Sequence, residues 1–298
     1  MELPYWSEGY GHVYAARTLW ESDYFLMVDD EARQGALRFA KEENGTFLTQ
    51  YEESPIPPMI ALPKLLAATD HISDENETAE DLRLLLAPGS SLGGARPKSS
   101  VRDANGQLLI AKFPHKADEI DIVRWEAVAL TLAKRAGISV PNWRLEMAAD
   151  RPVLLLYRFD RKGQARLPFL SAMSMLDAQD NDTHSYMEIV DVLRQYGASA
   201  KSDIQALWRR MVFNILISNT DDHLRNHGFL YQSPDGWRLS PAYDLNPVPT
   251  DISPRVLSTN IDLDGGAASL DLAFSVASYF ELDSKQARNI ASEVAKAT

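Results

Sequence analysis

The residues best suited to chemistry lie in two short polar segments of the last third of the chain. Asn219–His227 holds two aspartates, two histidines and two asparagines in nine positions, and it follows the apolar run Met211–Ile217 after one serine. Side chains of this polarity are normally solvated or bound to something. The second segment, Tyr243–Pro247, adds another aspartate, Asp244. These segments therefore hold the candidate reactive groups.

The order of the acids and amides fits phosphoryl transfer. Asp221 is followed five residues later by Asn226, and Asp244 comes eighteen residues after that. In a phosphoryl-transfer site, one aspartate accepts the proton of the attacking hydroxyl, while an asparagine and a second aspartate hold Mg²⁺ against the nucleotide phosphates. We therefore predict Asp221 as the catalytic base, with Asn226 and Asp244 as magnesium ligands.

Simpler interpretations compete for the same residues. An Asp-Asp-His sequence in a loop is usually a solvated turn, and Asp222 with Arg225 would form an ordinary surface pair. His223 and His227, four residues apart, would bind zinc together with Asp244 if the segment were helical. Residues elsewhere in the chain favour the phosphoryl-transfer interpretation.

Bulk composition limits the function classes. The 298 residues are 45% hydrophobic, which is enough for a sizeable core in one large or two modest domains. With 30 basic and 42 acidic residues the net charge is −12. The surface as a whole therefore repels nucleic acid and anionic lipid, and DNA association would need a partner or a local patch. The sequence has no cysteine, which excludes disulfides and thiolate chemistry.

The sequence carries no signal for export or membrane insertion. Met1–Trp6 has no basic region followed by an apolar stretch. The longest apolar runs are far shorter than a membrane span. We therefore expect a cytoplasmic protein with no membrane partner.

A segment rich in glycine and serine precedes the first expected hairpin. Pro88–Ser100 contains three glycines, four serines and two cations. Backbone N–H groups and hydroxyls in such a loop can surround phosphate oxygens. An ordinary linker has a similar composition, so this loop is a weak indication by itself.

Two charged residues downstream match a nucleotide clamp. Asn105-Gly106 predicts a hairpin, and its second strand, Leu108–Pro114, carries Lys112, whose ammonium group must reach solvent or meet an anion. Ile122–Ala136 has the period of an amphipathic helix and carries Glu126. In protein kinases such a glutamate holds such a lysine against the phosphates. A solvated glutamate on the helix surface is the simpler alternative.

The rest of the chain predicts a strand, then mainly helices. Val153–Arg161 has the pattern of a buried strand that runs into a polar connector, where a two-lobed kinase has its hinge. The expected helices are Phe169–Asp177, Tyr186–Gly197, Ser202–Ser218, Leu270–Val276 and Ser284–Lys296, with a hairpin over Gly228–Gln232 and Trp237–Ser240.

Taken in order, these motifs resemble those of the HipA-like serine/threonine kinases, the toxin components of bacterial toxin–antitoxin modules. The resemblance implies an α+β, two-lobed, protein-kinase-like fold, with a β-rich N-lobe over 1–165 and a helical C-lobe over 166–298. It also implies ATP and Mg²⁺ as cofactors. The matching segments are Ser91–Lys98, Lys112–Pro114, Arg158–Arg161, Asn219–Asn226 and Pro241–Asp244.

The resemblance gives roles to residues of the N-terminal half. Lys112 would contact the ATP phosphates, with Glu126 behind it. Phe159 would lie at the hinge near the adenine. The phosphate-binding loop would contain Ser91, Gly93 and Gly94.

Ser91 also matches the loop serine that such kinases autophosphorylate, with Ser90 as the neighbouring candidate. In the family this event is associated with ejection of the loop and loss of activity. A phosphate dianion there would repel the nucleotide phosphates, which gives the effect a physical basis.

The resemblance also implies partners. Family members phosphorylate aminoacyl-tRNA synthetases and are held inactive by a helix-turn-helix antitoxin that binds operator DNA. A protein substrate, an antitoxin and indirect DNA contact are therefore expected. The segment before Ala36 is shorter than the family's N-terminal subdomain, so either a separate protein complements it or the chain is shortened. A nucleotide- or antitoxin-binding module without phosphoryl transfer is the alternative function.

Overall fold

The computed structural model describes residues 20, 26, 28–49, 56–86, 96–232, 234–248 and 255–298. The chain divides into two compact units. Unit 1 comprises Met1–Val123 with Arg144–Arg158, and unit 2 comprises Arg124–Trp143 with Phe159–Thr298. The mixed α+β class expected from the sequence is confirmed. The lobes over 1–165 and 166–298 stay a prediction.

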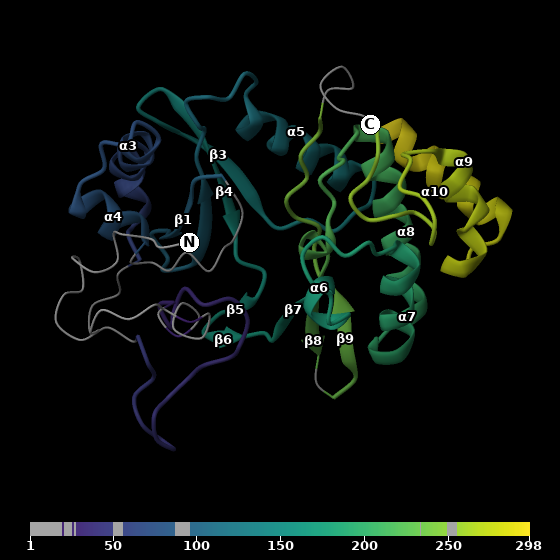
Figure 1. Ribbon diagram of the computed structural model, residues 1–298, viewed down its shortest axis with the longest axis horizontal. Coiled ribbons are helices and arrows are strands. Elements are labelled where there is room, and N and C mark those ends of the chain that lie inside the picture. Colours follow the sequence, from purple (N-terminus) through teal and green to yellow (C-terminus); the bar gives the residue numbers. More distant parts are fainter. Residues whose placement is uncertain are drawn as a thin grey trace. The chain divides into compact units, whose positions relative to one another are not determined.

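In its described residues, unit 1 contains a four-stranded sheet with the order β1-β2-β4-β3 and the helices α3 and α4 (Figure 1). Strands β1 and β2 pair antiparallel around the Asn105-Gly106 turn that the sequence predicts, and Gly106 has a φ of +76°. Strand β2 also pairs antiparallel with β4. The elements are η1 (Met59–Ala61), α3 (Leu62–Ser73), α4 (Ala79–Leu86), β1 (Lys98–Arg102), β2 (Leu108–Lys112), β3 (Trp143–Ala148) and β4 (Arg151–Tyr157).

One face of this sheet packs against the two helices. Leu109, Ala111 and Phe113 share the core with apolar side chains of α3 and β4. Successive residues of a strand point to opposite faces. Lys112 therefore points to the face opposite the helices.

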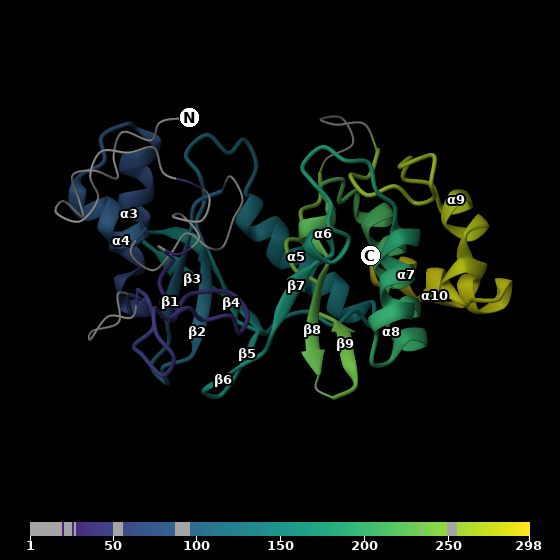
Figure 2. The ribbon, with the colours of Figure 1, turned by 60° about the horizontal axis from the view of Figure 1, so that its bottom comes forward.

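Unit 2 combines a three-stranded antiparallel sheet, β7-β8-β9, with a group of helices in which α8 contacts α7, α9 and α10 (Figures 1 and 2). Helix α5 (Ile122–Arg135) begins at the end of unit 1 and continues into unit 2. The other elements are β5 (Arg161–Lys162), β6 (Ala165–Arg166), β7 (Phe169–Ser171), α6 (Ala172–Met175), α7 (Tyr186–Tyr196), α8 (Ala200–Ile217), η2 (Leu224–Asn226), β8 (Gly228–Gln232), β9 (Gly236–Leu239), α9 (Leu270–Ser275), η3 (Ala277–Phe280) and α10 (Ser284–Ala297).

One predicted helix is wrong. The sequence predicts a helix over Phe169–Asp177, but Phe169–Ser171 is strand β7, and only Ala172–Met175 is helical in α6. Strand β7 pairs with β8, and the ring of Phe169 lies against Gly228, where an added Cβ would come within 2.4 Å of it. The tertiary contact overrides the local pattern. The other helices and the hairpin named above are confirmed to within two residues at each end.

Within the described ranges, no helix combines the length and apolar character needed to span a membrane.

Candidate functional site

The segment Asn219–His227, here called the 219–227 loop, begins where α8 ends. Ser218 closes the helix in the left-handed conformation, with a φ of +56°. The loop then has no regular structure until the single 3-10 turn η2. It is therefore not the helix that the zinc interpretation requires.

The zinc interpretation also fails on the histidines themselves. His227 is 3% exposed, and its Nε2 donates to the main-chain oxygen of Asp222 at 3.1 Å. Burial lowers the pKa of His227 to about 3, so the ring is neutral. In the part of the chain that the structure describes, which includes His223, His227 and Asp244, no three His, Cys, Asp or Glu side chains gather into a metal-binding group.

The carboxylate of Asp221 points outward. Its side chain is 60% exposed, and Oδ1 lies 3.9 Å from Nε2 of His223. Partial burial raises the pKa of Asp221, His223 opposes that change, and the negative charge of Asp244 raises the pKa further. Asp244 must therefore lie close enough to act on Asp221 through space.

Asn226 is oriented by the same loop. Its Nδ2 donates to the main-chain oxygen of Asp221 at 2.7 Å, and the residue is buried. The amide nitrogen is thereby committed to the loop, and the amide oxygen is the atom suited to a cation. Amide and carboxylate oxygens are the ligands that Mg²⁺ takes in proteins, and the mutual repulsion of Asp221 and Asp244 would be relieved by a divalent cation. The donor set fits magnesium.

Asp244 follows β9 in a loop with its own constraints. Its backbone is left-handed, with a φ of +57°, and Oδ1 accepts a hydrogen bond from Asn246 Nδ2 at 3.2 Å. The hydroxyl of Tyr243 donates to the main-chain oxygen of Arg225 at 2.6 Å. Burial raises the pKa of Tyr243, which keeps the hydroxyl protonated as a donor. The loop of Asp244 is therefore fastened to the 219–227 loop.

Asp222 corrects one expectation. The sequence suggests a surface pair with Arg225, but Asp222 is 1% exposed, and Arg225 pairs with Asp180 at 2.5 Å instead. Oδ2 of Asp222 accepts from the hydroxyl of Tyr186 at 2.5 Å, and Oδ1 accepts from the main-chain N–H of Thr259 at 3.3 Å. Burial raises the pKa of Asp222 to about 7.

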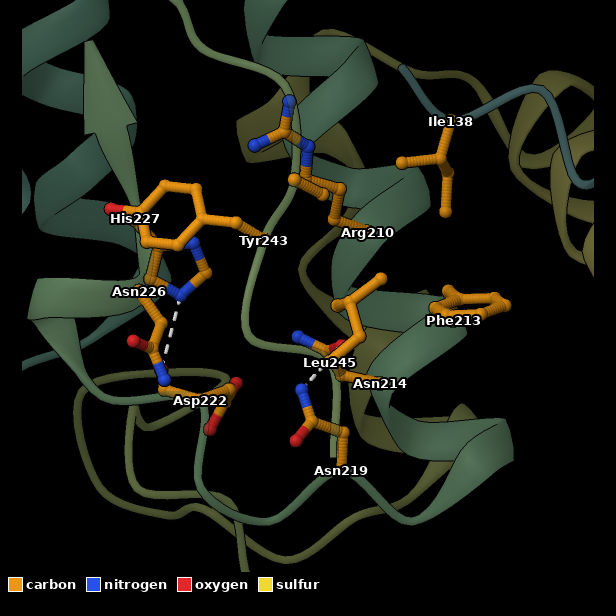
Figure 3. Close-up of a pocket in the computed structure, with 11 residues that line it drawn as sticks. Ile138, Arg210, Phe213, Asn214, Asn219, Asp222, Asn226, His227, Tyr243 and Leu245 are labelled. Carbon is orange, nitrogen blue, oxygen red and sulfur yellow. Dashed lines mark hydrogen bonds between the residues drawn. The ribbon is translucent and has the colours of Figure 1, made fainter. Parts of the chain in front are cut away.

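A cavity of unit 2 lies among these residues (Figure 3). Asp222 and Asn226 line it together with Asn214 and Asn219. Arg210 also lines the cavity, and burial lowers its pKa to about 10. The polar residues of the 219–227 loop thus share one cavity with side chains of α8, and apolar side chains such as Ile138 and Phe213 complete its lining.

Phe159 belongs to an aromatic group in unit 2. Its ring centroid lies 6.1 Å from that of Phe169 and 5.6 Å from that of Tyr243. The chain passes from unit 1 to unit 2 between Arg158 and Phe159, inside the segment expected as a hinge.

The remaining predicted site residues are placed as follows. Lys112 ends β2 in unit 1 and is half-buried. Glu126 lies in α5 in unit 2 and is buried, so it is not the solvated helix residue of the simpler alternative. The clamp between them stays a prediction. Ser90, Ser91, Gly93 and Gly94 lie outside the described residues.

Sequence reasoning missed the residues that support the 219–227 loop. Tyr186 and Thr259 contact Asp222, although they lie 36 and 37 positions away. Asn214 gave a usable signal, because it is a single amide in an apolar helical run and a buried amide must find hydrogen-bond partners. No comparable local signal marks Tyr186.

The comparison with known proteins decides the family. The family model of the HipA-like C-terminal domain matches residues 90–298. The chain belongs to this family. The HipA-like assignment made from the motifs is confirmed.

Curated relatives of this HipA-like chain carry kinase names. "Putative kinase Y4mE" of Sinorhizobium fredii is 25% identical over 273 residues, which cover 78% of this chain and 61% of that protein. A "Putative kinase" of Haemophilus influenzae is 26% identical over 179 residues, covering 53% of this chain and 52% of that protein. The HipA-like chain thus spans between half and two thirds of the length of these relatives.

A solved structure shares the fold. HipA of Shewanella oneidensis MR-1, solved in a complex of HipA, HipB and operator DNA, matches with a TM-score of 0.57 and 20% identity. The match covers 69% of this chain and 56% of that one. At this identity, the likeness concerns the fold alone.

Proposed function

We propose that this HipA-like protein is an ATP- and Mg²⁺-dependent serine/threonine protein kinase with a two-lobed fold. One observation carries the proposal. Asp221 lies outward on a loop to which Asn226 is hydrogen-bonded, and the charge of Asp244 reaches Asp221 from a second loop. Two acids and an amide in this order and proximity suit phosphoryl transfer to a hydroxyl.

Each residue of this set has one role. Asp221 accepts the proton of the attacking hydroxyl, and its exposed carboxylate can be reached by a side chain of a protein substrate. The oxygens of Asn226 and Asp244 hold Mg²⁺. Bound Mg²⁺ would neutralise the charge of the nucleotide phosphates.

The nucleotide-binding residues are proposed by position in the chain. Lys112 contacts the phosphates and is held by Glu126, while Phe159 lies near the adenine at the hinge. The change of unit at Arg158 and Phe159 supports a hinge there. The loop of Ser91, Gly93 and Gly94 covers the phosphates, and Ser91 is the autophosphorylated residue.

The proposed partners follow from the family. The substrate is a protein, such as an aminoacyl-tRNA synthetase, and a helix-turn-helix antitoxin restrains the kinase. The Shewanella HipA structure, which holds HipB and operator DNA, supports such a partner. The net charge of −12 favours DNA contact through the antitoxin only. Cytoplasmic location fits these partners.

Incubation of the purified protein with labelled ATP and Mg²⁺ tests the proposal. We expect label on the wild type, no label on Asp221→Asn, and a phosphopeptide containing Ser91 that disappears in Ser91→Ala. Label that persists on Asp221→Asn would refute the assigned base. ATP binding measured by calorimetry without any transfer would instead indicate a nucleotide-binding module.

A further inference from the structure

A directed chain of hydrogen bonds runs beneath the 219–227 loop. The main-chain N–H of Asn246 donates to Oδ1 of Asn219 at 3.2 Å. Nδ2 of Asn219 donates to Oδ1 of Asn214 at 3.1 Å (Figure 3). Nδ2 of Asn214 donates to the hydroxyl of Tyr186 at 3.0 Å. That hydroxyl donates to Oδ2 of Asp222 at 2.5 Å. The chain thus connects the loop of Asp244 with the residue next to Asp221.

The four side chains that form this chain are buried, while Asn246 contributes its main-chain N–H from a half-buried position. Asn214, Asn219, Tyr186 and Asp222 are each at most 3% exposed. A buried polar group that loses its partner bears the full cost of desolvation. Both asparagine amides use their oxygen and their nitrogen within the chain, which fixes the orientation of each one. The hydrogen bonds therefore define one orientation for each of the two asparagine side chains.

The main chain on both sides of Asp221 is held as well. The oxygen of Thr220 accepts from the N–H of Ser258 at 3.0 Å. The oxygen of Asp222 accepts from the hydroxyl of Thr259 at 2.7 Å and from His227 at 3.1 Å. With Asp222 anchored inward and both neighbouring carbonyls fixed, the side chain of Asp221 is directed outward.

We infer that Tyr186, Asn214 and Asn219 are positioning residues for phosphoryl transfer. Tyr186 holds Asp222, Asn214 orients the hydroxyl of Tyr186, and Asp222 sets the direction of Asp221. Asn219 connects this anchor to the loop that carries Asp244, so that the proton acceptor and the metal ligand keep a fixed relation. This inference rests on the proposed kinase function.

The variant Tyr186→Phe removes one hydroxyl and keeps the ring. Helix α7 offers a matched control at its other end, Tyr196→Phe, because Tyr196 is 47% exposed. We expect the kcat of Tyr186→Phe to be about 10- to 100-fold lower than that of the wild type, because small misplacements of reacting groups lower the rate by such factors. The KM for ATP should stay within about twofold of the wild type. Tyr196→Phe should match the wild type in both.

Hydrogen exchange gives a readout independent of activity. Peptides covering residues 219–227 should exchange faster in Tyr186→Phe than in the wild type or Tyr196→Phe. Asn219→Ser should lower kcat and also raise the Mg²⁺ concentration needed for half-maximal rate, because it frees the loop of Asp244. Tyr186→Phe should leave that concentration unchanged.

The outcomes separate the two proposals. A wild type without ATP-dependent transfer refutes the kinase function and this inference with it. If the wild type is active, and Tyr186→Phe has the same kcat and the same hydrogen exchange over residues 219–227, the inference is refuted and the kinase function is not. A lower melting temperature of Tyr186→Phe with unchanged kcat shows a merely structural role and also refutes it.

Discussion

The sheet of unit 1 and the 219–227 loop of unit 2 hold their candidate site residues by different means. Lys112 lies on a regular strand, paired with Lys98 on one side and Leu154 on the other, beside fully buried Leu109 and Ala111. Asp221 lies on an irregular loop that the buried side chains of Tyr186 and Asn214 hold through hydrogen bonds. An apolar core supports the first residue, and a chain of polar contacts supports the second.

The difference predicts how each region responds to substitution. Apolar packing is spread over many small contacts, so its loss lowers stability in a graded way. A hydrogen-bonded chain depends on each link, and one lost link changes orientation before it unfolds the protein. Stability should therefore be the sensitive property in unit 1, and catalysis in the 219–227 loop.

The largest effect is expected at Asp221. The proposed base contributes about 10²–10⁴-fold to the rate, so Asp221→Asn should lower kcat by that factor. Its exposed side chain predicts an unchanged melting temperature. Steady-state kinetics and thermal melting measure both quantities. Asp235→Asn, an exposed acid in the β8–β9 turn, is the control and should change neither. An equal loss of kcat in Asp221→Asn and Asp235→Asn would contradict the role of Asp221 as the base.

A stability effect is expected from the core of unit 1. Leu109 is fully buried between β2 and the helices, and Leu109→Ala should cost about 2–5 kcal/mol of unfolding free energy through the cavity it leaves. Denaturant unfolding measures this cost. The folded fraction should keep the kcat of the wild type. If Leu109→Ala is as stable as the wild type but has a lower kcat, then stability is not the sensitive property in unit 1.

A smaller effect is expected in the pH dependence of stability. The pKa of Asp222 is raised to about 7 from 3.8, so the folded state keeps a proton that the unfolded chain releases, and stability falls as pH rises from about 4 to 7. The pKa of His227 is lowered to about 3 from 6.5, so its contribution to stability rises between about pH 3 and 6.5. The two contributions oppose each other.

Single variants should separate these contributions. Melting temperatures of Asp222→Asn should rise with pH between 4 and 7 more steeply than those of the wild type, because only the histidine contribution remains. Those of His227→Gln should fall over the same range relative to the wild type. Parallel curves for the wild type and both variants would show that folding changes the pKa of neither Asp222 nor His227.

The smallest effect is expected at the surface of the loop. Arg225 and Asp180 form an exposed ion pair, and such pairs contribute little. Arg225→Ala should leave the melting temperature unchanged within error, since Tyr243 bonds to the main chain of Arg225 rather than to its side chain. A clear drop in melting temperature would show that surface charge also supports the loop.

Much of the fold follows from local patterns. The helical period predicts α7, α8 and α10, and Asn105-Gly106 predicts the turn between β1 and β2. The candidate site residues Asp221, Asn226 and Asp244 come from residue type and order, because two acids and an amide in this order suit phosphoryl transfer, and their roles stay a prediction. What local patterns cannot supply is context beyond a few residues.

Two cases show this limit. Asp221 and Asp222 are identical neighbours, yet one is open to solvent and the other buried, and the difference is made by Tyr186 and Thr259 far along the chain. The segment starting at Phe169 forms a strand because β8 offers a partner and Gly228 leaves room for the ring. Both depend on contacts between distant segments.

The left-handed backbone at Asp244 restricts which side chains can replace it. Glycine, asparagine and aspartate adopt a φ near +57° with little strain, whereas longer or branched side chains do so at a cost. Exchange for glutamate, usually the mildest change for an aspartate, is therefore unsuitable here. Asparagine preserves the local geometry and removes only the charge. Of the side chains that this main-chain shape favours, aspartate is the one that supplies the charge that the proposed chemistry demands.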